Sequence, residues 1–263
     1  VSYISVDEQG LICEKELKEV FQKEKNIILV SVMLVNNEIG TIQPIAHVAS
    51  LIRKYRKDHG SVYPYLHTDA CQAPCYLDMQ IDKLGVDLLS LDGGKIYGPR
   101  GVGCLYIKRG VRIEKISQGG AQESDIRPGT ENLPAIVGFA KALEICTKEK
   151  EKENIRLRKL QEYIINNLPE GVTVNGSVDV EKRISNNINI CIPDKDSEFV
   201  LFQLDVQGFE VSTGTTCQNK QEESRSYVVD ALGHNCGASS LRISFGRFTK
   251  FGEVKSLIKV LKK

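Results

Sequence analysis

The alternation of apolar runs with helical patterns over residues 26–107 most constrains the fold. A near-continuous apolar run at 26–35 predicts a strand covered on both faces, and further strands are predicted at 1–6, 62–66, 87–91 and 101–107. Between 26–35 and 62–66, apolar residues recur at helical spacing after Pro44 and before Gly60. Strands that alternate with helices form parallel sheets with right-handed crossovers. The sequence therefore predicts an α/β fold with a mostly parallel sheet.

Three polar residues follow the ends of predicted strands, namely Asn37, Asp69 and Lys95. Ligands of open α/β sheets bind at the carboxyl edge, so we expect an amide, a carboxylate and an amine to meet in one crevice. Gly93 and Gly94 precede the lysine, which predicts a side chain that is close to the backbone and partly desolvated. Desolvation lowers the pKa of an amine and suits Schiff-base chemistry. The ordinary alternative is a surface lysine whose stem packs on the protein.

The pattern changes after a long predicted helix at 132–168. Shorter elements follow, with strands at 172–174, 187–192, 209–212 and 240–244, and helices at 197–206, 222–232 and 253–261. We therefore expect two domains, a large domain over 1–135 and a smaller α+β domain over 136–263.

Two residues of the second half suggest chemistry. Cys217 lies in a polar, glycine-containing loop, where a thiol can be activated, although most lone cysteines are inert. Arg242 lies in a predicted strand and needs an anionic partner, either a structural carboxylate or a ligand.

Composition excludes several classes of protein. The 263 residues carry a net charge of +1 without a basic stripe, so no direct nucleic-acid partner is expected. No apolar run reaches membrane-spanning length, so no membrane partner is expected. Eight cysteines form no C-x-x-C pair, which argues against a metal site. This cysteine usage predicts a reducing cytoplasm.

Several long motifs then occur in order: VNNEIGTIQPI, HTDACQA, DLLSLDGGKIYGPRGVGCLYIKRG, GGAQESDIRPGTENLPAIVGFAKAL, FEVSTGTTC and SLRISFGRFT. Together they resemble the NifS/IscS-like cysteine desulfurases of aminotransferase class V, which are pyridoxal-phosphate enzymes of fold type I. The resemblance implies conversion of L-cysteine to L-alanine, with the sulfur transferred as an enzyme persulfide for iron–sulfur cluster assembly or tRNA thiolation. The alternatives are another pyridoxal-phosphate lyase, such as a selenocysteine lyase, and an inactive fragment of the family.

The resemblance implies a set of cofactor residues. Lys95 would hold pyridoxal 5'-phosphate covalently and move protons, and Asp69 would pair with the pyridinium nitrogen so that the ring can accept electrons. Gln72 and Asn37 would hydrogen-bond the phenolic oxygen of the ring. Thr130 would reach the cofactor phosphate of a partner subunit, which implies a homodimer.

The resemblance also implies how the substrate is handled. Arg242, with Asn37 beside it, would bind the carboxylate of L-cysteine. Cys217 would accept the sulfur and pass it to an acceptor protein, either an iron–sulfur scaffold or a tRNA-thiolation enzyme.

Two kinds of departure from the family pattern stand out. The family places a hydroxyl residue at Asp92 and a histidine at Gly94, both of which touch the cofactor phosphate. An aspartate facing that phosphate would repel it. The family's N-terminal phosphate-binding turn and its ring-stacking histidine have no counterpart here, so we expect the chain to be a fragment that is inactive by itself.

Overall fold

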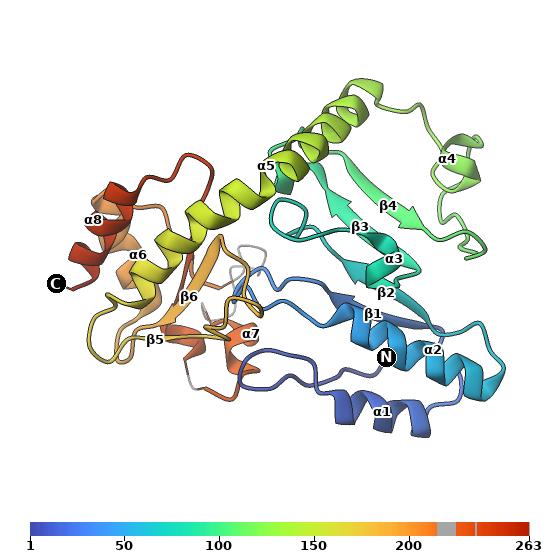
Figure 1. Cartoon of the computed structure of the whole chain (residues 1–263), viewed down its shortest axis with the longest axis horizontal. Helices are drawn as coiled ribbons and strands as arrows, with labels where there is room; N and C mark the ends of the chain where they lie inside the picture. The colour runs from blue at the N-terminus through green and yellow to red at the C-terminus, as the bar shows by residue number, and fades with distance from the viewer. Residues whose placement is uncertain (215–224, 235, 263) are drawn as a thin grey trace. The chain divides into compact units, whose positions relative to one another are not determined.

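A computed structural model of the chain describes residues 1–214, 225–234 and 236–262 (Figure 1). The chain forms two compact units that interleave along the sequence. The terminal unit comprises Val1–Lys25, Val35–Gln43 and Lys150–Lys263, and the central unit comprises Asn26–Leu34 and Pro44–Glu149. The two units are defined by contacts in space. The predicted domains, 1–135 and 136–263, were defined by a change in sequence pattern, so their bounds are of a different kind and stay a prediction.

A four-stranded sheet, in the order β1-β2-β3-β4, organises the central unit (Figure 1). Its strands are β1 (Leu29–Met33), β2 (Tyr65–Asp69), β3 (Leu88–Asp92) and β4 (Gly103–Ile107). The first three strands are parallel and β4 is antiparallel to β3, which confirms the mostly parallel sheet. The remaining elements of this unit are α2 (Ile45–His59), α3 (Ile81–Leu84), η1 (Gly93–Ile96) and α4 (Gln122–Asp125).

The helix α2 shows how local sequence sets an element. One face of it is apolar and buried, comprising Ile45, Val48, Ala49, Ile52 and Tyr55. Pro44 precedes the first turn, where its missing N–H costs nothing. The helix ends at Gly60, whose φ of 60° lies in the left-handed region that glycine adopts without strain.

The terminal unit contains a three-stranded antiparallel sheet, ordered β5 (Thr173–Val174), β6 (Asn187–Cys191) and β7 (Ser240–Ser244). Every residue of β6 is buried. The helical elements of the unit are α1 (Glu14–Lys23), α6 (Ser197–Val206), α7 (Tyr227–Asp230), η2 (Gly237–Ser239) and α8 (Phe251–Leu261). Cys191 and Cys236 form a disulfide with a Cα–Cα distance of 5.9 Å, so two cysteines that we expected to be thiols are paired.

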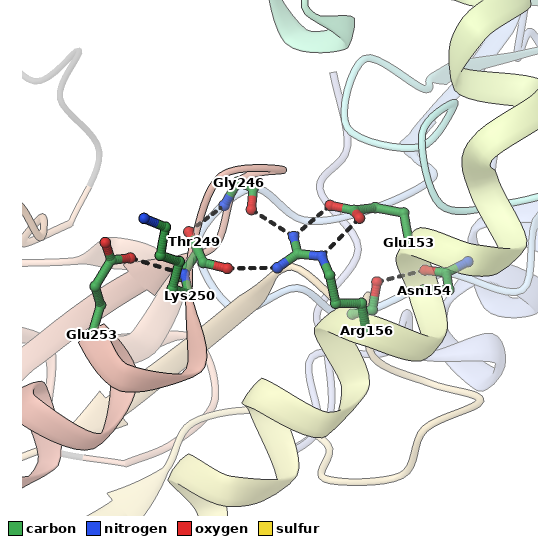
Figure 2. Close-up of polar contacts among 8 residues, drawn as sticks. Glu153, Asn154, Arg156, Gly246, Thr249, Lys250 and Glu253 are labelled. Atoms are coloured by element: carbon green, nitrogen blue, oxygen red, sulfur yellow. Dashed lines mark hydrogen bonds and ion pairs between the residues drawn. The ribbon is translucent and has the colours of Figure 1, made fainter.

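The long helix α5 (Leu133–Ile165) contributes residues to both units. Within the terminal unit its Arg156 is held by a fork of hydrogen bonds (Figure 2). Arg156 Nη1 donates to Thr249 O at 2.6 Å, and Nη2 donates to Gly246 O at 2.8 Å. The same guanidinium pairs with Glu153 one turn earlier on the helix, at 2.6 Å. This arginine therefore fastens the loop before α8 to α5. No helix in the described part of the chain is long and apolar enough to cross a membrane.

Several sequence expectations about strands are wrong. The strand β1 is not covered on both faces, because Leu29 is 47% exposed, and among the described strands β1 lies at the edge of the sheet. Residues 1–6 form no strand, only a single bridge between Val6 and Ile12. Residues 209–212 likewise contribute one bridge, between Ser212 and Arg242. The helix predicted at 222–232 is restricted, in its described part, to α7.

Candidate functional site

The carboxyl ends of β2 and β3 place two of the predicted cofactor residues in the central unit. Asp69 is the last residue of β2 and lies opposite Ser90 in the register. The chain is held where it leaves the sheet, because Ala70 N donates to Ser90 O at 3.0 Å. The carboxylate of Asp69 accepts a hydrogen bond from Cys71 N at 2.9 Å. Its side chain is therefore fixed at the sheet edge, where α/β folds bind ligands.

Lys95 lies in η1, the short helix that directly follows β3. The turn depends on Gly93, since a Cβ there would lie 2.7 Å from Pro99 O and 2.9 Å from Val102 O. Lys95 itself is exposed. The partial desolvation that we expected of this lysine is therefore wrong, although the preceding glycine does allow the tight turn.

Asp92 is the N-cap of η1, and its Oδ1 accepts a hydrogen bond from Gly94 N at 2.9 Å. The two positions at which this chain departs from the family pattern are thus bonded to each other. The resemblance predicted that the Asp92 carboxylate faces the cofactor phosphate. In the structure, this carboxylate instead accepts a hydrogen bond from a backbone amide of its own turn. A capping carboxylate of this kind satisfies an otherwise orphaned N–H group.

The thiol of Cys71 lies next to these charged groups and was missed by the sequence analysis as a member of the site. Burial, a hydrogen bond with Asp69 and the negative charges of Asp69 and Asp92 raise its pKa to about 12, against a lowering by Lys95. Cys71 is therefore hydrogen-bonded to Asp69 and electrostatically coupled to Asp92 and Lys95. The available signal was its position two residues after Asp69.

In the terminal unit, Asn37 and Arg242 are in contact, while their predicted role in binding a carboxylate stays a prediction. Arg242 Nη1 donates to Asn37 O at 3.4 Å, so the contact uses the main chain of Asn37. The backbone of Arg242 is paired on one side with Asn189 of β6 and on the other with Ser212. The guanidinium therefore projects from a backbone that is fixed on both sides.

Glu38, the neighbour of Asn37, is a second residue that sequence reasoning missed. It is fully buried, and its Oε2 accepts a hydrogen bond from Ser226 Oγ at 2.5 Å. Burial raises the pKa of this carboxyl, while Ser226 and the positive charge of Arg242 oppose the rise. The structure thus provides the anionic neighbour that a strand arginine needs. A charged residue next to Asn37 in a turn was the available signal.

The other predicted residues lie as follows. Gln72 is half-buried in the turn after Asp69, and Thr130 is exposed in the central unit. Cys217 falls outside the described residues. Asp69, Gln72 and Lys95 belong to the central unit, and Asn37 and Arg242 to the terminal unit, so a common crevice for all of them stays a prediction.

Comparison with known proteins defines the class of the chain. The model of the aminotransferase class-V family matches residues 1–257, and the chain therefore belongs to that family. It is 36% identical over 268 residues to "Cysteine desulfurase IscS" of Dictyoglomus turgidum, and 37% identical over 263 residues to the protein of the same name from Methanosarcina thermophila. The matches cover 100% and 99% of this chain, but the chain spans only 65% and 63% of the length of those relatives.

Solved structures give the same assignment of fold. The X-ray structure of a NifS-like protein from Rickettsia africae superposes with a TM-score of 0.87 at 28% identity. That match covers 98% of this chain and 68% of the other. A second structure described as a NifS-like protein has a TM-score of 0.86 at 30% identity. These neighbours confirm the fold class that the motifs predicted.

Proposed function

We propose that this chain carries the chemistry of a pyridoxal-phosphate-dependent cysteine desulfurase. The observation that supports the proposal is that Asp69 ends β2 and Lys95 directly follows β3, the neighbouring strand, so both residues lie at the carboxyl edge of the central unit's sheet. Similarity over 99–100% of this chain to proteins named cysteine desulfurase supports it. The overall conversion is L-cysteine plus the Cys217 thiol to L-alanine plus a Cys217 persulfide.

The side chains at the sheet edge fit the ring of the cofactor. An exposed amine at Lys95 is accessible to an aldehyde, and the fixed carboxylate of Asp69 is suited to a protonated ring nitrogen. Gln72 would bond the phenolic oxygen. When bound, the cofactor supplies an electron sink for the substrate. At the phosphate end, Asp92 and Gly94 satisfy each other, so this pair offers no donor to an anion.

The terminal unit would bind and cleave the substrate. Arg242, beside Asn37, would take the α-carboxylate of L-cysteine as a charge-assisted pair. Cys217 would attack the substrate sulfur, so the carbon–sulfur bond breaks as a sulfur–sulfur bond forms. The described residues that flank its segment lie together: a Cβ on Gly214 would be 3.8 Å from Ser226 Cα. Lys95 would deliver the proton that completes alanine.

The proposal includes partners and a location. Thr130 would reach the cofactor phosphate of a second copy, which makes the working unit a homodimer. The persulfide would pass to an iron–sulfur scaffold or a tRNA-thiolation enzyme. We place the protein in the cytoplasm because of its scattered cysteines without C-x-x-C pairs, although the Cys191–Cys236 disulfide argues the other way.

Because we expect the chain to be inactive by itself, the test uses an extended chain, in which the segment that the Dictyoglomus turgidum relative carries before the matched region is joined to residue 1. The extended chain is incubated with pyridoxal 5'-phosphate and L-cysteine, L-alanine is measured, and persulfide is mapped by mass spectrometry. We expect persulfide on Cys217 and loss of both products in Cys217→Ala. Cys104→Ala, which removes an exposed cysteine of the central unit, is the matched control and should keep both. Turnover of Cys217→Ala at the parent rate would refute the desulfurase mechanism and favour another lyase.

A further inference from the structure

The carboxyl of Glu38 is held in one place inside the terminal unit. It belongs to the turn 36–40, in which Asn36 Oδ1 accepts hydrogen bonds from Glu38 N at 2.9 Å and from Ile39 N at 3.0 Å. The main-chain oxygen of Glu38 accepts from Asn187 Nδ2 at 3.1 Å. Its Oε2 accepts from Ser226 Oγ, which itself accepts from Val229 N at the start of α7. The backbone of Glu38 is held by the side chains of Asn36 and Asn187, and its carboxyl is held by Ser226, so hydrogen bonds at both ends fix the position of this carboxyl.

Arg242 lies near Glu38 without a hydrogen bond to its carboxyl. Arg242 Nη1 donates to the main-chain oxygen of Asn37, the residue before Glu38, at 3.4 Å, and Asn189, which is opposite Arg242 in the register, donates from Nδ2 to Glu38 O at 3.3 Å. Glu38 Oε1 and Arg242 Nε are both buried and have no hydrogen-bond partner among the described residues. The two groups nevertheless attract each other electrostatically. A buried carboxylate requires a compensating charge, and Arg242 provides one.

We propose that Glu38 is a positioning residue that orients the guanidinium of Arg242 for the α-carboxylate of the substrate; the inference rests on the proposed function. An arginine that binds a carboxylate in the bidentate mode must keep two parallel N–H groups available. A direct ion pair with Glu38 would occupy them. An anion that attracts the guanidinium while bonded to Ser226 instead orients it and leaves its donors for the ligand.

The decisive substitution is Glu38→Gln, which keeps an oxygen that can accept from Ser226 and removes only the charge. With the charge gone, KM for L-cysteine should rise about tenfold, while kcat stays within about twofold, because a binding contact is weakened and the reacting groups are untouched. Ser226→Ala removes the hydrogen bond and retains the charge, so it should raise KM less than Glu38→Gln does. Glu170→Gln, which neutralises an exposed carboxylate of the same unit, should leave KM unchanged.

A second measurement is independent of turnover. The Nε–H resonance of Arg242, assigned by its disappearance in Arg242→Lys, should shift in Glu38→Gln and stay in place in Glu170→Gln. If Glu38→Gln leaves both KM and this resonance unchanged while the extended parent chain is active, the positioning role of Glu38 is refuted and the desulfurase function is supported. If the extended parent chain releases no alanine, the desulfurase function is refuted. A shifted resonance then still supports the Glu38–Arg242 coupling, and an unshifted one overturns it.

Discussion

Arg56 and Asp87 form an ion pair inside the central unit, between α2 and the residue that precedes β3. The side chain of Asp87 is only 5% exposed, and its Oδ2 also accepts a hydrogen bond from Leu66 N at 2.8 Å. Arg56 Nε donates to Pro64 O at 2.9 Å. The pair therefore joins α2 to the beginning of two neighbouring strands, at the opposite end of the sheet from Asp69.

Removal of this arginine should destabilise the central unit strongly. Arg56→Met leaves the carboxylate of Asp87 buried, and the remaining cation paired with it among the residues that the structure describes is Lys108, whose Nζ lies 3.7 Å from Asp87 Oδ1. We expect the free energy of unfolding to fall by about 3–5 kcal/mol, the usual cost of breaking a buried pair on one side. Urea unfolding followed by circular dichroism measures it, with the exposed Arg109→Met as control. A loss as small as that of the control would show that the pair contributes nothing.

Glu38 should make stability fall as pH rises. Its folded-state pKa is raised above the ordinary value of 4.5, chiefly by burial. Below 4.5 the carboxyl is protonated in the folded and unfolded states, so its contribution to stability is fully present. At higher pH the unfolded chain ionises first, and that contribution is lost by the time the pH passes the folded-state pKa. Since glutamine does not titrate, the stability of the parent relative to Glu38→Gln should decrease between pH 4 and pH 7 in urea unfolding. A pH-independent difference would contradict this.

Cys71 should resist alkylation. With a pKa raised from 9.0 to about 12, its thiolate at pH 8 is roughly a thousandfold scarcer than that of an ordinary cysteine, and only the thiolate reacts. Mass spectrometry after iodoacetamide treatment should show far slower labelling of Cys71 than of a cysteine in a free peptide. Asp69→Asn removes a neighbouring charge and should speed the labelling. Equal rates for Cys71 and the peptide thiol would contradict the environment described.

Lys95 should be the covalent attachment point of the cofactor. After incubation with pyridoxal 5'-phosphate and reduction with borohydride, peptide mapping should find the label on Lys95, because this exposed lysine follows β3 at the sheet edge where β2 ends in Asp69. Lys95→Ala should lose the label completely. Lys83→Ala, which removes another exposed lysine of the central unit, should retain it. A label that persists on a different residue in Lys95→Ala would overturn the assignment.

Local patterns in the sequence were enough to predict most elements. The helix at Ser197–Val206 and the strand at Ser240–Ser244 have the bounds that periodicity gave, since each carries its own start signal or apolar period. Asp196, for example, caps its helix by accepting from Glu198 N at 2.8 Å. The polar residues at strand ends, such as Asp69 and Lys95, could be predicted to lie at one edge of the sheet. Parallel strands have their carboxyl ends at the same edge, so this placement needs only the alternation of strands and helices in the sequence.

Other features depend on contacts that no local pattern encodes. The turn that carries Asn37 follows β1, a strand of the central unit, in sequence. It nevertheless belongs to the terminal unit through hydrogen bonds such as that from Asn187 Nδ2 to Glu38 O, between residues 149 positions apart. The carboxylate of Asp92 could face a phosphate or accept a hydrogen bond from a backbone amide, and the residue type alone does not predict which of the two occurs. The structure shows the backbone amide, Gly94 N. The role of Glu38 became visible only once Ser226 and Arg242 were placed around it.

The interleaving of the two units has a consequence for the order in which the chain folds during synthesis. All parts of the central unit have been made once residue 149 is added, so that unit can fold early. Residues 1–25 and 35–43 must instead wait for β6 and β7, which lie more than 100 residues later. Closing such long loops costs entropy before any contact repays it, and domains fold as units as they leave the ribosome. We therefore expect the pair of Asn37 and Arg242 to assemble last, after the sheet of the central unit has formed.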